Sequence, residues 1–172
     1  MEELKNCNLC KLASTRKNIL IPCFTSAKGM IVSENPTSKE DKSGIYSDPS
    51  WKKVESALEY YGHRIDEFYV TSGIKCAPEV NRYPSQEEIK NCSKFFLKEI
   101  SEIKPKAILF LGESIAKYYV HVDAYTYINR KFKTRLCDDV YVTYNPKSLR
   151  SGTQENDEFR GIFRQFIASC LS

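Results

Sequence analysis

The sequence contains no long hydrophobic segment. Its longest apolar run, Ala107–Leu111, is far shorter than the roughly 20 residues that a membrane-spanning helix needs. The first residues, MEELKNCNLCKL, mix acids with bases and lack the apolar region of a signal peptide. Internal repeats and low-complexity tracts are also missing. We therefore expect a protein of the cytoplasm or nucleoid that is not secreted and does not bind membranes.

A strong charge of one sign is lacking as well. The net charge is +4, which permits an anionic partner such as nucleic acid without requiring one. With 172 residues, of which 41% are hydrophobic and 28% charged, the chain has the composition of an ordinary globular protein. We expect one domain over residues 1–172. The two histidines, His63 and His121, match no motif and are expected to be ordinary core or surface residues.

Cysteine, by contrast, is abundant, with seven residues. Cys7 and Cys10 form a CxxC motif, Cys76 lies in IKCAPEVNRYP, and Cys92 follows on a predicted helix. A redox CxxC would follow a strand, which is not predicted before Cys7, and a zinc site would usually show a second close pair. Four thiolates also suit an iron–sulfur cluster, whereas Cys76 and Cys92 could simply be small buried side chains. The spacing alone leaves these alternatives open.

Predicted strands and helices alternate along the chain. The strands are expected at Met30–Val32, Phe68–Thr71, Ala107–Leu111 and in DVYVTYNP; the helices in WKKVESALEYYG, after the Ser85/Glu88 capping pattern, in ESIAKYYV and over Glu155–Leu171. Thr37–Pro49 is expected to be a loop. This order predicts an α/β fold, a single-domain three-layer α/β/α sandwich with a mainly parallel central sheet.

Three unusual turns fall at predicted strand ends: SENPT, TSGIKC and YNPKS. In parallel sheets, ligands bind beyond the carboxyl ends of the strands. The pattern therefore locates a candidate site at these turns before any chemistry is assigned.

Several longer stretches narrow the alternatives: CNLCKLASTRKNILIP, MIVSENP followed by KEDKSG, YVTSGIKCAPEVNRYPSQEEIKNC, ILFLGESIAKYYV and VTYNPKSLR. Together they resemble the iron–sulfur (family-four) uracil-DNA glycosylases over nearly the whole chain. The pattern K-C-x-P-x-x-N-R-x-P, followed by a helical cysteine, is the most specific match. The resemblance implies a uracil-DNA glycosylase-like fold and a DNA repair enzyme that hydrolyses the N-glycosidic bond of uracil or a related deaminated or modified base.

The resemblance also implies a cofactor. In that family the four cysteines of this pattern hold a [4Fe–4S] cluster, which assigns Cys7, Cys10, Cys76 and Cys92 as ligands. Because hydrolysis needs no electron, the cluster is expected to be structural. The remaining cysteines, Cys23, Cys137 and Cys170, are expected to be structural too.

Catalytic roles follow from the same resemblance. Glu34 matches the family's acid, which positions water or stabilises the sugar cation. Asn35 replaces an alanine and stands where mismatch-type and single-strand-selective relatives carry a water-holding Asn. Asn145 replaces the histidine of T-Y-H-P and would donate a hydrogen bond to the departing base.

Base and DNA contacts are also implied. Ser72 replaces the base-reading Asn of Y-I-T-N, and one hydroxyl cannot reproduce the donor and acceptor pair of an amide. Tyr46 is an approximate match, offset by one residue, to the stacking aromatic. Leu149 is a candidate wedge for the gap left by a flipped base. The candidate phosphate contacts are Lys147, Ser148 and Arg150.

The substitutions leave alternatives to a glycosylase. Ser33, Thr37, Ser72 and Asn145 all replace family-typical residues, which would also fit a non-catalytic DNA-binding relative in a repair or replication complex. A third alternative is an enzyme acting on free nucleosides. We favour a glycosylase, because substituted sites often retain some activity. No Lys in the matched motifs suits Schiff-base chemistry, so the enzyme is expected to be monofunctional. It is expected to act as a monomer on single-stranded or mismatched duplex DNA.

Overall fold

The structure, a computed structural model, describes residues 2–22, 28–79, 82–121 and 126–172. Within them the chain forms a five-stranded sheet of order β2-β1-β3-β5-β4. The strands are β1 (Met30–Ser33), β2 (Tyr69–Ser72), β3 (Ala107–Leu111), β4 (Arg130–Phe132) and β5 (Asp139–Thr143). All pairs are parallel except β4 with β5, which confirms the predicted, mainly parallel sheet.

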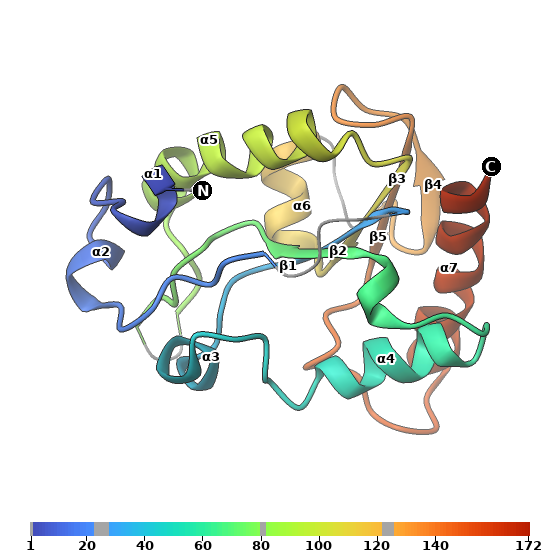
Figure 1. Ribbon diagram of the computed structural model, residues 1–172. Helices are drawn as coiled ribbons and strands as arrows, with labels where there is room; N and C mark the ends of the chain where they lie inside the picture. The colour runs from blue at the N-terminus through green and yellow to red at the C-terminus, as the bar shows by residue number, and fades with distance from the viewer. Residues whose placement is uncertain (1, 23–27, 80–81, 122–125) are drawn as a thin grey trace.

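Helices cover both faces of the sheet (Figure 1). One face packs against α5 (Gln86–Ile103) and α6 (Glu113–Val120), and the other against α4 (Trp51–Glu59) and α7 (Gln154–Leu171). The short helices are α1 (Glu2–Lys5), α2 (Leu12–Thr15), α3 (Ser38–Ser43) and the 3-10 turn η1 (Ile65–Glu67). The predicted three-layer α/β/α sandwich is therefore confirmed.

The buried strands alternate between the two layers. On β3, Ile108 and Phe110 belong to the α5–α6 core, whereas Ala107, Leu109 and Leu111 belong to the α4–α7 core. Because successive strand side chains point to opposite faces, a strand that is apolar at every position must be covered on both sides. This run is the central strand of the sheet.

Local signals set the ends of the long helices. At the start of α5 the Ser85 Oγ accepts from the Glu88 N–H at 3.2 Å, and the Glu88 carboxylate accepts from the Ser85 N–H at 2.8 Å. This is the predicted capping box. On α7 five apolar residues at helical spacing are all buried in the α4–α7 core: Phe159, Ile162, Phe163, Phe166 and Ile167.

One segment differs from its sequence-based interpretation, and one strand was not predicted. The predicted loop Thr37–Pro49 contains α3, which begins with a capping box between Thr37 and Glu40 and ends at Gly44 in the left-handed region. The polar composition of this segment concealed the capping signal. Within the basic stretch NRKFKTR, Arg130–Phe132 forms the edge strand β4, which is not predicted from the sequence. Lys131 of β4 pairs with Asp139, and Lys133, just after the strand, pairs with Asp138. The positive charge of this stretch is therefore partly neutralised within the protein.

Two further expectations concern membrane-spanning helices and Cys23. Among the described residues, none of the helices has the length and apolar character needed to cross a bilayer. Cys23, expected to be structural, lies outside the described residues.

Candidate functional site

Glu34 and Asn145, predicted from different motifs, meet at the carboxyl edge of the sheet. Glu34 follows β1 and is 9% exposed. Its Oε2 accepts a hydrogen bond from Asn145 Nδ2 at 2.7 Å, across 111 positions of sequence. Its Oε1 accepts from the backbone N–H of Ser114 at 3.2 Å, at the start of α6. A carboxylate is well placed there, because the first N–H groups of a helix point outward and favour negative charge.

Gly112 makes this approach possible. It joins β3 to α6 with a φ of +109°, a backbone conformation that favours glycine. A Cβ at this position would lie 2.7 Å from Glu34 Oε1. The absence of a side chain at Gly112 therefore allows both the sharp turn into α6 and the close packing of the Glu34 carboxylate.

The Asn145 amide is oriented by two contacts. Nδ2 donates to Glu34, and Oδ1 accepts from the backbone N–H of Lys147 at 3.0 Å. An amide nitrogen carries two hydrogens, so Nδ2 can donate to a ligand while it keeps its bond to Glu34. This arrangement presents a carboxylate and an N–H donor side by side.

These side chains line a cavity of about 730 Å³ at the strand ends. Its walls include Glu34, Asn35, Arg82, Tyr83, Gly112, Asn145, Lys147 and Ser148. Asn35 faces this space, but its Nδ2 donates to the Pro36 carbonyl at 2.8 Å. To hold a water molecule through that nitrogen, Asn35 would use its second hydrogen or exchange this bond.

The two predicted base-binding residues lie away from this cavity. Ser72, at the end of β2, is fully buried, and its Oγ has no hydrogen-bond partner among the described residues. The Tyr46 ring packs edge-on against Trp51 of α4, with 5.4 Å between ring centroids. Neither residue is part of the cavity wall. A base would have to extend beyond this cavity, toward the α4 layer, to reach either of them.

In the turn after β5, some of the predicted DNA-contact residues are exposed and one is buried. Lys147, Ser148 and Arg150 are exposed, as phosphate contacts must be. Leu149 is 7% exposed and packs into the α4–α7 core. As a wedge between DNA bases, Leu149 would therefore have to leave this core. The sequence shows an apolar residue near a strand end but not the path of the turn that buries it.

The four predicted ligand cysteines line one small cavity beside the first half of α5. Cys7, Cys10, Cys76 and Cys92 share its wall with Arg16, among others. Arg16 donates from Nη2 to the Cys7 carbonyl at 2.6 Å and from Nη1 to the Cys76 Sγ at 3.8 Å. Burial, together with the neighbouring thiols, raises the pKa of Cys76 to about 12 and that of Cys92 to about 11. The four thiols thus gather around a common, partly apolar space.

The arrangement of the four cysteines bears on the kind of metal group that they could bind. Over residues 2–22, 28–79, 82–121 and 126–172, no three Cys, His, Asp or Glu side chains converge closely enough to hold one metal ion. A structural zinc ion needs four ligands converging on a single atom. Four cysteines at one cavity supply the thiolate donor set that iron–sulfur clusters use.

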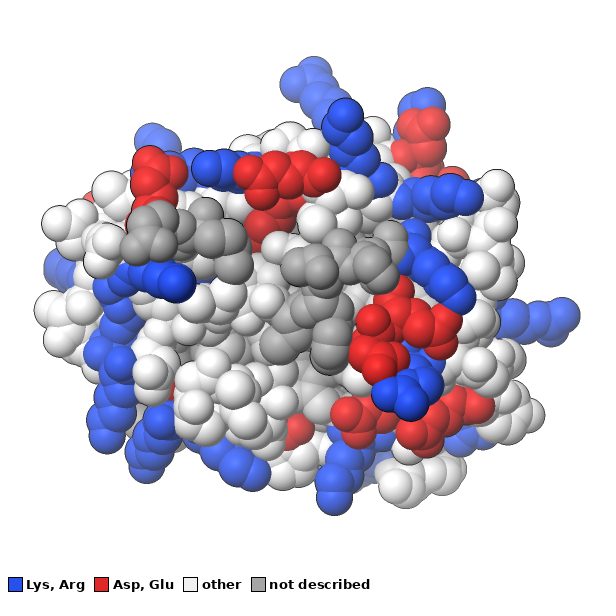
Figure 2. Space-filling view, viewed as in Figure 1, with Lys and Arg blue, Asp and Glu red and all other residues white. Residues whose placement is uncertain are grey.

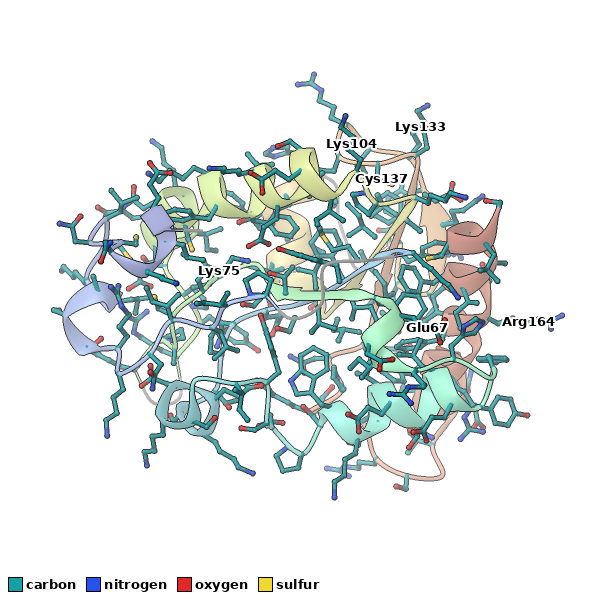
Figure 3. All side chains as sticks on the ribbon, viewed as in Figure 1. Glu67, Lys75, Lys104, Lys133, Cys137 and Arg164 are labelled. Atoms are coloured by element: carbon teal, nitrogen blue, oxygen red, sulfur yellow. The ribbon has the colours of Figure 1, made fainter. Side chains whose placement is uncertain are left out.

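A buried ion pair beneath this region was not anticipated. Lys75 is fully buried, and its Nζ donates to the Glu99 carboxylate at 2.8 Å, to the Thr71 hydroxyl and to the Ser72 carbonyl (Figure 3). Burial raises the pKa of Glu99, and the Lys75 ammonium opposes this rise. Lys75 precedes a predicted cluster ligand and bonds to the backbone of the predicted base-binding residue. The sequence gives no signal that Lys75 and Glu99 would meet.

Comparison with known proteins gives consistent matches. Residues 23–167 match the family model described as the uracil DNA glycosylase superfamily. The Type-4 uracil-DNA glycosylase of Pyrobaculum aerophilum is 34% identical over 118 residues, which cover 67% of this chain and 60% of the relative. That of Sulfurisphaera tokodaii is 35% identical over 121 residues, covering 68% and 54%.

One relative aligns over almost the full length. The Type-4 uracil-DNA glycosylase of Archaeoglobus fulgidus is 26% identical over 182 aligned positions, covering 99% of this chain and 91% of the relative. The matches to the Pyrobaculum and Sulfurisphaera relatives, in contrast, span less than two thirds of the length of those proteins.

Proposed function

The chain belongs to the uracil DNA glycosylase superfamily, and we propose that it is a monofunctional DNA glycosylase that hydrolyses the N-glycosidic bond of uracil or a related deaminated base. The observation that carries this proposal is the Glu34–Asn145 pair at the wall of the strand-end cavity. It offers an acceptor for water or a sugar cation and a donor for a leaving base in one place.

In the proposed reaction, the target nucleotide leaves the base stack and its base enters the cavity. Asn145 donates its second Nδ2 hydrogen to a carbonyl oxygen of the base, where negative charge grows as the bond to the sugar breaks. The Glu34 carboxylate holds the attacking water near C1′ and stabilises the positive sugar. Asn35 adds a further amide to the water site. We assign the leading role to Glu34, because its carboxylate is fixed by two donors.

Contacts to the DNA backbone are proposed at the rim. Lys147, Ser148 and Arg150 project from the turn after β5. Lys and Arg side chains also line the left and lower edges of the molecule in Figure 2, the end at which α2 and α3 lie in Figure 1. Such contacts release counterions, so affinity for DNA should fall steeply as salt rises.

Base selection is proposed to be loose. Ser72 pairs in register with Ser33 at the ends of β2 and β1, and its buried hydroxyl offers donor and acceptor only through a single oxygen atom. An amide would offer a donor and an acceptor together. If Tyr46 and Ser72 form the base pocket, discrimination between uracil and other bases should be weaker than with an amide.

We further propose that Cys7, Cys10, Cys76 and Cys92 hold a [4Fe–4S] cluster. Four thiols at one cavity support this assignment, as does an Arg16 donor to Cys76 Sγ, which would stabilise a bound thiolate. When bound, the cluster would supply a covalent tie between the N-terminal segment and α5. Its role here is stability, and the hydrolysis proposed above does not pass through it.

The deciding experiment is a single-turnover excision assay with cluster-loaded, anaerobically purified protein. Substrates carry uracil, hypoxanthine, xanthine or thymine in single strands and mismatched duplexes. Base release that is lost in Glu34→Gln supports the proposal and names the substrate. If no substrate is cleaved but DNA binds, the protein is a non-catalytic DNA-binding relative, and preferential cleavage of free deoxynucleosides would indicate the nucleoside enzyme. A monomer acting on DNA in the cytoplasm or nucleoid remains our expectation, and sedimentation would test the monomer.

A further inference from the structure

The turn after β5 is held from another layer of the fold by a lysine. Lys53, the third residue of α4, donates from Nζ to the Pro146 carbonyl at 2.8 Å and to the Leu149 carbonyl at 2.7 Å. These two carbonyls flank the exposed residues Lys147 and Ser148. One ammonium group thus forms hydrogen bonds on both sides of the tip of the turn.

Lys53 makes two charge-assisted hydrogen bonds to the turn from one partly buried side chain. Hydrogen bonds from a charged donor are shorter and stronger than those between neutral groups. Lys53 is partly buried, and its neighbours Trp51 and Val54 are anchored in the α4–α7 core. Fixing a lysine costs rotamer entropy, which two charge-assisted bonds on a core-anchored helix offset.

Besides the bonds from Lys53 and the bond from Asn145 Nδ2 to Glu34, two backbone N–H groups form hydrogen bonds within the turn. The Ser148 N–H donates to the Asn145 carbonyl at 3.0 Å, and the Lys147 N–H donates to Asn145 Oδ1 at 3.0 Å. They give the turn its shape and orient the Asn145 amide relative to its own backbone. The bonds from Lys53 place the whole turn against α4, and with it the Asn145 side chain against Glu34.

We propose that Lys53 is a positioning residue for the strand-end site. It holds the turn so that Asn145 Nδ2 stays on Glu34 Oε2 and the tip of the turn faces the DNA. We call the two hydrogen bonds from Lys53 to the Pro146 and Leu149 carbonyls the clamp. The kinetic consequence of this inference rests on the proposed glycosylase function, whereas the clamp itself does not depend on that function. The competing role for a lysine near the rim is a direct phosphate contact, which would affect DNA affinity rather than the rate of the bound complex.

The kinetic test compares K53M, K53R and the matched control K52M. Lys52 is the exposed neighbour on α4 and makes no bond to the turn among the described residues. At saturating enzyme, K53M should excise about tenfold more slowly, with its half-saturating concentration changed less than about twofold. K53R should recover most of the rate, because a guanidinium can donate to two carbonyls at once. K52M should retain the wild-type rate.

A second readout needs no activity. Amide hydrogen exchange at Lys147 and Ser148 reports directly on the turn. K53M should speed exchange at these two amides about tenfold, K53R less, and K52M not at all. If the wild-type protein excises no base and K53M still speeds this exchange, the proposed function fails and the clamp stands.

Three results would overturn the proposal. They are unchanged exchange at Lys147 and Ser148 in K53M, a wild-type excision rate in K53M, and a raised half-saturating concentration with an unchanged rate. The last would make Lys53 a phosphate contact. The milder K53Q is measured alongside, so that the comparison holds even if K53M lowers Tm.

Discussion

The strand-end site and the cysteine cavity are built in opposite ways. Glu34 and Asn145 stand on turns that the parallel sheet itself brings together, and a direct 2.7 Å bond joins them. The cysteine cavity depends on an N-terminal segment whose helices, α1 and α2, have four residues each. Helices this short are not stable alone. The sheet preorganises the first region, whereas the second would depend on the proposed cluster to hold its N-terminal segment in place.

A few contacts do tie the N-terminal segment to the rest of the chain. Leu4 and Leu12 are buried in the α5–α6 core, Asn91 of α5 donates to the Leu9 carbonyl at 3.0 Å, and the Lys17 N–H donates to Asp41 at 2.9 Å. They position the segment near α3 and α5, but they do not involve the four thiols themselves. This difference between the two regions leads to four predictions.

The largest effect is expected from Glu34→Gln. The amide keeps the size of the side chain but removes the negative charge, so single-turnover excision should fall at least about 100-fold. Affinity for DNA and Tm should stay close to wild type. The exposed Glu59→Gln on α4 serves as the control and should excise normally. An unchanged rate in Glu34→Gln would remove Glu34 from the mechanism.

Loss of one thiolate should be the next largest effect. Cys76→Ser should lose the cluster's visible absorbance and destabilise the protein by about 3 kcal/mol or more, because metal binding contributes folding free energy. Hydrogen exchange should rise first over residues 2–20 and only later in β1 and β3. Cys137→Ser is the control, since this thiol bonds to the Pro105 and Lys106 carbonyls outside the cavity. A Cys76→Ser protein with a normal cluster content would contradict the ligand assignment.

Gly112→Ala should damage the strand-end site without touching the cysteine cavity. The new Cβ would meet Glu34 Oε1 at 2.7 Å on a backbone with φ of +109°. We expect a loss of about 1–3 kcal/mol in stability and a clear drop in excision, with normal cluster absorbance. Gly161→Ala in α7 has open space around its Cβ and should be neutral or slightly stabilising. Equal behaviour of the two variants would show that the close approach to Glu34 is unimportant.

The smallest effect is expected at Glu67, which lies on η1, away from both regions (Figure 3). Hydrogen bonds from Lys28, the Arg64 backbone and His63 lower its pKa from 4.5 to about 2. Because the folded pKa is depressed, the stabilisation is present above about pH 4.5 and is lost as pH falls toward 2. Because the Lys28–Glu67 pair is largely solvated, its contribution to the free energy of unfolding is below about 1 kcal/mol. Glu67→Gln should flatten that part of the stability curve in acid titrations, and an unchanged curve would contradict the assignment.

The sequence predicted those parts of the fold that have local signals. β3 was visible as an unbroken apolar run, and α5 as a capping box before a periodic segment. The edge strand β4 was not visible, because its exposed, charged residues carry no alternation and its pairing is set by β5. In α3 the capping box was hidden in a polar segment that looked like a loop.

For the site, the strand-end turns and the resemblance indicated which residues could take part. Which of these residues contact one another could be seen only in the folded structure. No sequence rule pairs Lys75 with Glu99 across two elements, or Lys53 with the carbonyls of Pro146 and Leu149. The burial of Leu149 follows from the path of its turn rather than from its position after a strand. Which residues belong to the site could be predicted from the sequence, whereas the orientation of their side chains depended on long-range packing.

The bond between Glu34 and Asn145 also has a consequence for biosynthesis. Its two ends are 111 residues apart, and the strands that carry them are separated in the sheet by β3. A chain emerging from the ribosome therefore displays the Glu34 carboxylate long before Asn145 and its turn are made. Incomplete chains would lack the donor for a leaving base, so the proposed excision of bases could begin only after synthesis has passed the last parallel strand.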